Sequence, residues 1–126
     1  MAEKKKILVV DDEPDMVEWL TTFFQDNGYS TSFAYDGFSG FEKVKAEKPD
    51  LITLDISMEK ESGIKMYRNL HEDKEASKIP VVMLTGVSAD FKRFISTRSQ
   101  VPPPQAYFEK PVDRDELLKK VRELLG

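Results

Sequence analysis

Residues whose side chains could take part in phosphoryl transfer lie at the ends of four short apolar runs in this chain: Asp11 and Asp12, Asp55, Thr85, and Lys110. Short apolar runs that alternate with helical patterns predict a parallel sheet with helices on both faces. In such sheets the ligand site lies beyond the carboxyl ends of the strands. We therefore expect three carboxylates, a hydroxyl and an ammonium to meet at one sheet edge. That set is typical of divalent metal binding and of phosphoryl transfer to a carboxylate.

The adjacent carboxylates of Asp11 and Asp12 indicate a metal site. Two like charges at a strand end repel each other, and a hard cation such as Mg²⁺ removes that repulsion while keeping waters and phosphate oxygens as ligands. Asp55, at the end of another run, would complete an acidic pocket. The alternative is that Asp11 only caps the following helix. The presence of Asp55, Thr85 and Lys110 at matching strand ends favours the metal site.

Phosphoryl transfer would give distinct roles to the remaining residues. Asp55 is the candidate nucleophile, because carboxylates can form acyl phosphates. Lys110 would meet the charge of the transferring group, and Thr85 would donate its hydroxyl to a phosphoryl oxygen. The alternative for Lys110 is an ordinary solvated lysine, but we expect a cis bond to Pro111 that aims its side chain inward. His71, the only histidine, is expected at a solvated helix end.

The composition is that of a soluble globular chain. Its 126 residues predict a single domain, 1–126, that is large enough to bury a core. With 19 basic and 23 acidic side chains the net charge is −4, so no attraction to nucleic acid or to a membrane is expected. The absence of cysteine excludes disulfides and thiolate sites. Neither a signal peptide nor a bilayer-spanning apolar segment is recognised, so the expected location is cytoplasmic.

Apolar periodicity and turn residues predict an α/β fold in which five strands alternate with five helices. The strands are expected at residues 5–10, 29–35, 50–55, 79–84 and 105–109. The helices are expected at 13–27, from Asp36-Gly37 to just before Pro49, and at 63–73, 88–99 and 113–125. Inward-facing positions are expected to include Phe38, Phe41 and Val44 in the second helix, and Leu117, Leu118, Val121 and Leu124 in the last.

Four motifs resemble those of the receiver domains of two-component response regulators: Ile7–Glu13, Pro49–Asp55, Val81–Gly86 and Tyr107–Pro111. Their order and spacing cover nearly the whole chain, whose size is close to that of the stand-alone chemotaxis type. The resemblance implies a flavodoxin-like, doubly wound (βα)5 sheet with strand order 2-1-3-4-5.

The same resemblance implies roles for individual residues. A Mg²⁺ site would be formed by Asp12, by Asp11 through a water, by Asp55, and by the backbone carbonyl of Ser57. Asp55 would be the phosphoacceptor and Lys110 would contact the phosphoryl group. Thr85 and Tyr107 fall on the positions of the family's switch pair, and Gly63 matches the glycine of its loop.

The implied function is a phosphorylation-dependent signalling switch. A sensor histidine kinase or a histidine phosphotransfer protein would supply the phosphoryl group from a phosphohistidine, and a downstream output protein or effector domain would read the state. The chain would catalyse only its own phosphorylation and dephosphorylation. It would be a monomer or a phosphorylation-dependent dimer, without direct contact to nucleic acid or membrane.

The chain departs from the family pattern at Glu59, where proline is usual, and at Gly86, where alanine is common. The segment 99–105, with three consecutive prolines, replaces a short turn. A phosphatase of the haloacid dehalogenase type is the competing enzyme class. The motif of that class is Asp-x-Asp, whereas this chain has Asp55-Ile56-Ser57 and lacks the second carboxylate. A receiver-like domain that is never phosphorylated is disfavoured because the required residues are present. Flavin binding is not supported, because the sequence contains no phosphate-cradling loop.

Overall fold

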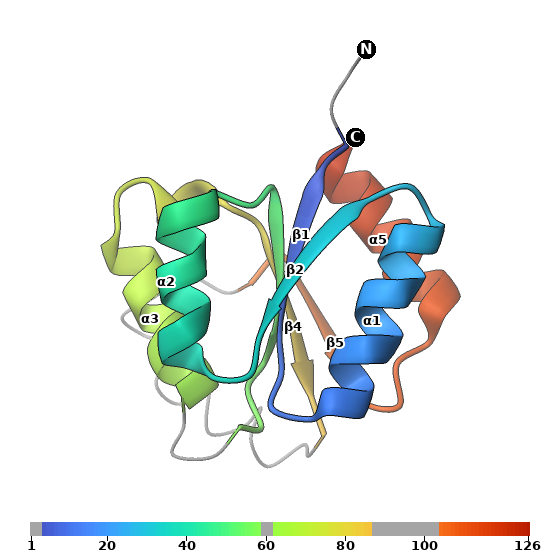
Figure 1. The fold of residues 1–126 in the computed structure, drawn as a ribbon, viewed down its shortest axis with the longest axis horizontal. Helices are drawn as coiled ribbons and strands as arrows, with labels where there is room; N and C mark the ends of the chain where they lie inside the picture. The colour runs from blue at the N-terminus through green and yellow to red at the C-terminus, as the bar shows by residue number, and fades with distance from the viewer. Residues whose placement is uncertain (1–3, 59–61, 87–103) are drawn as a thin grey trace.

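Five parallel strands form one sheet with helices packed on both faces (Figure 1). The computed structural model describes residues 4–58, 62–86 and 104–126. The strands are β1 (Lys6–Val10), β2 (Ser30–Ala34), β3 (Leu51–Asp55), β4 (Val81–Thr85) and β5 (Ala106–Glu109), in the order β2-β1-β3-β4-β5. The helices are α1 (Pro14–Asp26), α2 (Gly37–Glu47), α3 (Ser62–Glu72) and α5 (Arg114–Leu125), with a 3-10 turn η2 (Ala76–Lys78). The predicted α/β class and flavodoxin-like strand order are confirmed.

The hydrophobic core consists of two layers, one on each side of the sheet. Successive residues of a strand point to opposite faces. In β1, Ile7 and Val9 therefore pack toward α1 and α5, whereas Leu8 and Val10 pack toward α2 and α3. Figure 1 shows these two helix pairs on opposite sides of the strands. The two layers cover the sheet on both sides.

The central strands are apolar along nearly their whole length because both of their faces are covered. All five residues of β3 and all five of β4 are buried. The parallel register places Asp55 beside Leu84, near the ends of the two strands. Polar residues that end these strands are consequently brought to the same sheet edge.

Local polar contacts begin two of the helices. The Asp36 carboxylate accepts a hydrogen bond from the Ser39 N–H at 2.7 Å and so caps α2. Asp113 caps α5 by accepting from the backbone N–H groups of Asp115 and Glu116. These caps place the helix starts beyond the carboxyl ends of the preceding strands.

The predicted inner face of α2 is wrong at its first position. Phe38 is 77% exposed, whereas Val44 is buried and Phe41 packs partly against the core. The first turn of α2 instead turns Gly37 and Gly40 inward, and a Cβ on Gly37 would overlap the Ser62 carbonyl oxygen. Close approach of α2 to α3 thus leaves no room for a large side chain on the inner side of that turn.

The last helix follows its predicted pattern only in part. Leu117 and Val121 are fully buried and Leu124 packs partly against the core, but Leu118 lies outside both core layers. The helix predicted at 88–99 and most of the proline segment fall outside the described residues. The cis Lys110-Pro111 bond is confirmed. Within the described ranges, every helix is too short or too polar to cross a bilayer.

Candidate functional site

The sequence-predicted site residues meet at the carboxyl edge of the sheet. Asp11 directly follows β1, Asp55 and Thr85 are the last residues of β3 and β4, and Lys110 directly follows β5. Asp11, Asp55 and Thr85 are all buried. The parallel topology alone accounts for this convergence, because it brings the same end of each strand to the same side.

Lys110 is the electrostatic centre of the site. Its Nζ atom lies 3.0 Å from Oδ2 of Asp11, 3.2 Å from Oε1 of Glu13 and 3.3 Å from Oδ2 of Asp55. Burial alone would lower the pKa of Lys110, but the hydrogen bond to Asp11 and the charges of Asp55 and Asp11 raise it well above its usual range. The ammonium therefore stays charged, and the solvated-lysine alternative is excluded.

Asp11 has two roles at once, because each of its oxygens has its own partner. Oδ1 accepts the Glu13 N–H at 2.9 Å at the start of α1, while Oδ2 accepts from Lys110. Burial is the main reason that the pKa of Asp11 rises from 3.8 to about 6, and the charge of Asp55 raises it further. The Glu13 N–H and Lys110 oppose that rise. Asp11 therefore contacts both the start of α1 and the lysine at the centre of the acidic group.

Four carboxylates gather at this edge: Asp11, Asp12, Glu13 and Asp55. One ligand oxygen from each lies within 4.8 Å of all the others, so the group is compact enough to hold one cation. Asp12 and Glu13 are exposed, so the group opens to solvent on one side. Glu13 was not predicted as a site residue, although its place directly after two aspartates was the available signal.

Ser57 connects the ends of β3 and β4. Its backbone N–H donates to Oδ1 of Asp55 at 2.7 Å. Its hydroxyl oxygen accepts a hydrogen bond from the Gly86 N–H at 2.8 Å and lies 3.0 Å from Oγ1 of Thr85. The resemblance assigned a role only to the Ser57 carbonyl, so these side-chain contacts are additional.

Tyr107 lies on β5, which pairs with β4, and its partner residue on β4 is Met83. Its ring is half-buried and packs against the core layer beneath α2 and α3. Thr85 lies on the same strand, two residues after Met83. The two members of the predicted switch pair, Thr85 and Tyr107, are therefore on adjacent strands. The site and the outer strand are thus connected through β4.

His71 is not simply a solvated residue at a helix end. It is half-buried, and its ring packs edge-on against Tyr67 with 4.5 Å between the ring centres. Burial lowers the pKa of His71, which favours the neutral imidazole. It belongs to the packing of α3 rather than to the acidic site.

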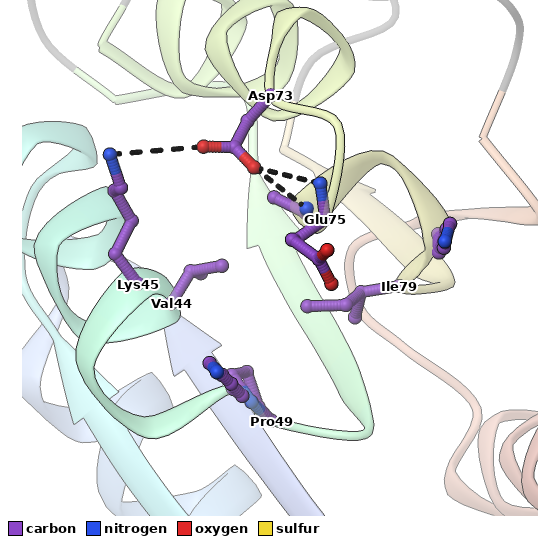
Figure 2. A pocket seen from close by; sticks show the side chains of 9 residues that line it. Val44, Lys45, Pro49, Asp73, Glu75 and Ile79 are labelled. Atoms are coloured by element: carbon purple, nitrogen blue, oxygen red, sulfur yellow. Dashed lines mark hydrogen bonds and ion pairs between the residues drawn. The ribbon is translucent and has the colours of Figure 1, made fainter.

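A cavity of about 370 Å³ lies at the other end of the sheet, beside the residues that precede β3 and β4 (Figure 2). Apolar side chains such as Val44 and Ile79 line it, and Lys45 lies 3.8 Å from Asp73 at its rim. Asp73 also accepts two backbone N–H bonds, as Figure 2 shows. None of the predicted site residues lines this cavity.

Residues 7–122 match the response regulator receiver domain family, and the chain belongs to it. It is therefore a receiver domain of two-component signal transduction. Members of this family use Mg²⁺ at an acidic pocket and interact with sensor kinases and output partners.

Individual relatives include both short and long proteins. The chain is 32% identical to protein PilH of Pseudomonas aeruginosa over 96% of its own length and 98% of that protein. It is 34% identical to the alkaline phosphatase synthesis transcriptional regulatory protein PhoP of Bacillus subtilis, of which it spans 48%. In fact it spans about half the length of several other curated relatives.

Solved structures give the same picture of the fold. Chemotaxis protein CheY4 of Vibrio cholerae is 25% identical, with a TM-score of 0.83 over 98% of this chain and 100% of that one. The signal receiver domain of a signal transduction histidine kinase from Syntrophus aciditrophicus is 29% identical, with a TM-score of 0.84 over 96% of this chain and 89% of that one.

Proposed function

We propose that residues 1–126 form one receiver domain that acts as a phosphorylation-dependent switch, with Asp55 as the phosphoacceptor. The observation that carries this proposal is the way the buried Asp55 carboxylate is held at both oxygens. The Ser57 N–H donates to Oδ1 at 2.7 Å, and the Lys110 Nζ lies 3.3 Å from Oδ2. A fixed carboxylate beside an ammonium provides a nucleophile and a charge partner for the incoming group.

The proposed Mg²⁺ ligands are Asp12, Asp55, the Ser57 carbonyl and, through a water, Asp11. The fit is supported by the spacing of the carboxylates and by Asp11, whose pKa is raised to about 6 by burial and by the charge of Asp55. Mutually repelling carboxylates gain from a shared cation. When bound, Mg²⁺ supplies positive charge that offsets the charge of the phosphoryl oxygens.

The reaction transfers a phosphoryl group from a donor imidazole to Asp55. A carboxylate oxygen forms a bond to phosphorus while the bond between phosphorus and the imidazole nitrogen breaks. The electron pair of the broken bond stays on that nitrogen, which takes up a proton from solvent. Lys110 keeps its proton and faces the charge of the transferred group, and Thr85 donates its hydroxyl to a phosphoryl oxygen. Water later hydrolyses the acyl phosphate, which releases phosphate and restores the Asp55 carboxylate.

Thr85 and Tyr107 would convert this chemistry into a change of surface. As Thr85 moves toward the phosphoryl oxygen, it leaves space into which the Tyr107 ring can turn. The half-buried ring of Tyr107 and the direct pairing of β4 with β5 support this route. Beryllofluoride with Mg²⁺ should therefore shift the NMR signals of Tyr107, and unchanged Tyr107 signals would contradict the route.

The proposed partners follow from the chemistry of the site. A sensor histidine kinase or a histidine phosphotransfer protein supplies the phosphohistidine, and an output protein or effector domain reads the surface of β5 and α5. The domain works in the cytoplasm, as a monomer or as a phosphorylation-dependent dimer. The net charge of −4 supports partners other than nucleic acid.

Intact-mass spectrometry after incubation with acetyl phosphate and Mg²⁺ tests the function. We expect the mass of one phosphoryl group on the wild type and none on Asp55→Asn, which keeps the shape of the side chain without the nucleophile. Asp50→Asn is the matched control, because Asp50 precedes the same strand at its other end and accepts the Lys6 N–H at 2.8 Å. Phosphorylation of Asp55→Asn at the wild-type level would overturn the assignment.

A further inference from the structure

The Ser57 hydroxyl contacts two groups, one at the end of β4 and one in the turn that follows it. The Gly86 N–H donates to Ser57 Oγ at 2.8 Å, and Oγ1 of Thr85 lies 3.0 Å from the same oxygen. A backbone N–H can only donate, so the serine oxygen must act as an acceptor toward Gly86. One oxygen is thus bound where two strand-end groups converge.

This arrangement lies directly beside the Asp55 carboxylate. The Ser57 N–H donates to Oδ1 of Asp55 at 2.7 Å, so the backbone of Ser57 is fixed to the candidate nucleophile. Backbone N–H groups and hydroxyls fixed next to a nucleophile are the groups that stabilise the oxygens of a transferring phosphoryl group. In the unmodified protein the serine oxygen engages them instead.

We propose that the Ser57 hydroxyl holds the place of a phosphoryl oxygen and must leave it before the Asp55 phosphoryl group can be fully bound. The inference rests on the proposed function and adds a means of regulation to the same site. Because Ser57 is tethered two residues after Asp55, its hydroxyl competes with a phosphoryl oxygen for the Gly86 N–H and for contact with Thr85 at a high effective concentration, unlike a water molecule. Ser57 is therefore a positioning residue that favours the unphosphorylated state.

Space around Gly86 is compatible with such an exchange. A Cβ at Gly86 would meet Ser57 Oγ only at 3.8 Å and the Lys110 side chain at 4.0 Å, which are ordinary contacts. Gly86 is exposed, so its N–H can be reached from solvent once the serine hydroxyl turns away.

The test measures the affinity for beryllofluoride, a phosphoryl mimic, at saturating Mg²⁺ in the full chain. Ser57→Ala removes the acceptor of the Gly86 N–H and the contact with Thr85 Oγ1. We expect its affinity to rise about three- to tenfold, the effect of about one net hydrogen bond. Ser57→Thr restores a hydroxyl and should return the affinity toward the wild-type value. An affinity of Ser57→Ala that is equal to or weaker than that of the wild type would overturn the proposal.

Amide hydrogen exchange of Gly86 supplies a readout that a general loss of stability does not reproduce. We expect faster exchange at Gly86 in free Ser57→Ala than in the wild type, and equal protection once beryllofluoride is bound. Ser62→Ala is the matched control, because it also removes a serine oxygen that accepts a glycine N–H, that of Gly37 at 3.1 Å. It should leave both the Gly86 exchange and the analogue affinity unchanged.

The outcomes separate this proposal from the function on which it rests. Failure of the wild type to bind beryllofluoride or to accept a phosphoryl group at Asp55 would overturn both. Normal uptake with unchanged Gly86 exchange in Ser57→Ala would overturn the role of Ser57 alone.

Discussion

The Lys110 ammonium lies 3.3 Å from the Asp55 carboxylate, although the two residues belong to the ends of β5 and β3, which β4 separates in the sheet. The lysine side chain therefore reaches across the end of β4. Only 15% of it is exposed, while the Asp55 carboxylate is almost completely covered. This pairing ties an outer strand to the centre of the sheet.

Removing this cation should destabilise the metal-free protein. Lys110→Met leaves three carboxylates without their shared ammonium, and we expect a loss of about 1–3 kcal/mol, below the usual loss for a fully buried pair because solvent reaches the site. Added Mg²⁺ should restore more stability to this variant than to the wild type, because it replaces the missing charge. Urea unfolding in EDTA and in Mg²⁺ measures both effects.

Lys6→Met is the control for that experiment. Lys6 pairs with Glu47 at 3.3 Å, but both side chains are about one-third exposed, at 37% and 30%. Its loss should cost about 0–1 kcal/mol and should not depend on Mg²⁺. Equal losses for the two variants, with equal responses to Mg²⁺, would contradict the central role of Lys110.

The raised pKa of Asp11 predicts a pH-dependent effect of removing its charge. The folded pKa of about 6 lies above the ordinary value of 3.8, so the folded protein favours the protonated carboxyl. The contribution of protonated Asp11 to the free energy of unfolding is fully present below about pH 3.8 and is lost as the pH rises through about 6. In EDTA, Asp11→Asn should therefore be more stable than the wild type at pH 7.5, by up to about 3 kcal/mol.

That gain should shrink as the pH falls toward 4, where the wild-type carboxyl carries its proton. Saturating Mg²⁺ should also reduce it, because the cation stabilises the ionised wild-type site. Asp26→Asn, on the exposed side of α1, is the control and should show neither trend. A gain for Asp11→Asn that is the same at pH 4 and pH 7.5 would show that charge is not its cause.

The location of the site could be predicted because it depends on strand ends. Asp55 and Thr85 end buried apolar runs, and parallel pairing brings such ends together whatever the details of the helices. The partners of the Ser57 hydroxyl could not be predicted, because they depend on the spacing between the β3 and β4 ends and on a side-chain rotamer. Glu13 joins the site through the turn from β1 into α1, which apolar periodicity does not describe.

Helix faces were predicted less well than strand ends. Helical spacing relates Phe38, Phe41 and Val44. The first turn of α2, however, packs against the start of α3, and this close contact requires glycine at position 37 of α2. Apolar periodicity identifies a stripe but not where along the helix the neighbouring element comes closest. Leu118 of α5 shows the same limit, since it lies beside the buried stripe rather than in it.

Two glycines near the site should respond oppositely to alanine. A Cβ on Gly63 would overlap the carbonyl oxygen of Asp55, whereas a Cβ on Gly86 would meet only ordinary contacts. Gly63→Ala must push α3 away from the end of β3, and we expect a loss of about 1–3 kcal/mol. Gly86→Ala should be neutral or stabilising by up to about 1 kcal/mol, because it restricts the unfolded chain. Thermal melts that rank the two variants in the other order would contradict this account.

Thr53 provides the last prediction, in the middle of the sheet. Its side chain is fully buried, and its hydroxyl has no hydrogen-bond partner among the described residues. Its neighbours on β1 and β4 are Val9 and Val82, so a valine at this position would match the surroundings. A buried hydroxyl without a partner costs free energy that the shape-matched methyl group does not.

Thr53→Val should therefore raise the free energy of unfolding by about 1 kcal/mol, measured by urea titration. Thr21→Val is the control, because the half-buried Thr21 hydroxyl of α1 already donates to the Val17 carbonyl at 2.8 Å. That substitution should bring no gain. Thr53 lies two residues before Asp55 but makes none of the site contacts described above, so uptake of a phosphoryl group from acetyl phosphate should stay at the wild-type rate. A loss of stability in Thr53→Val would instead mean that the hydroxyl is satisfied in solution.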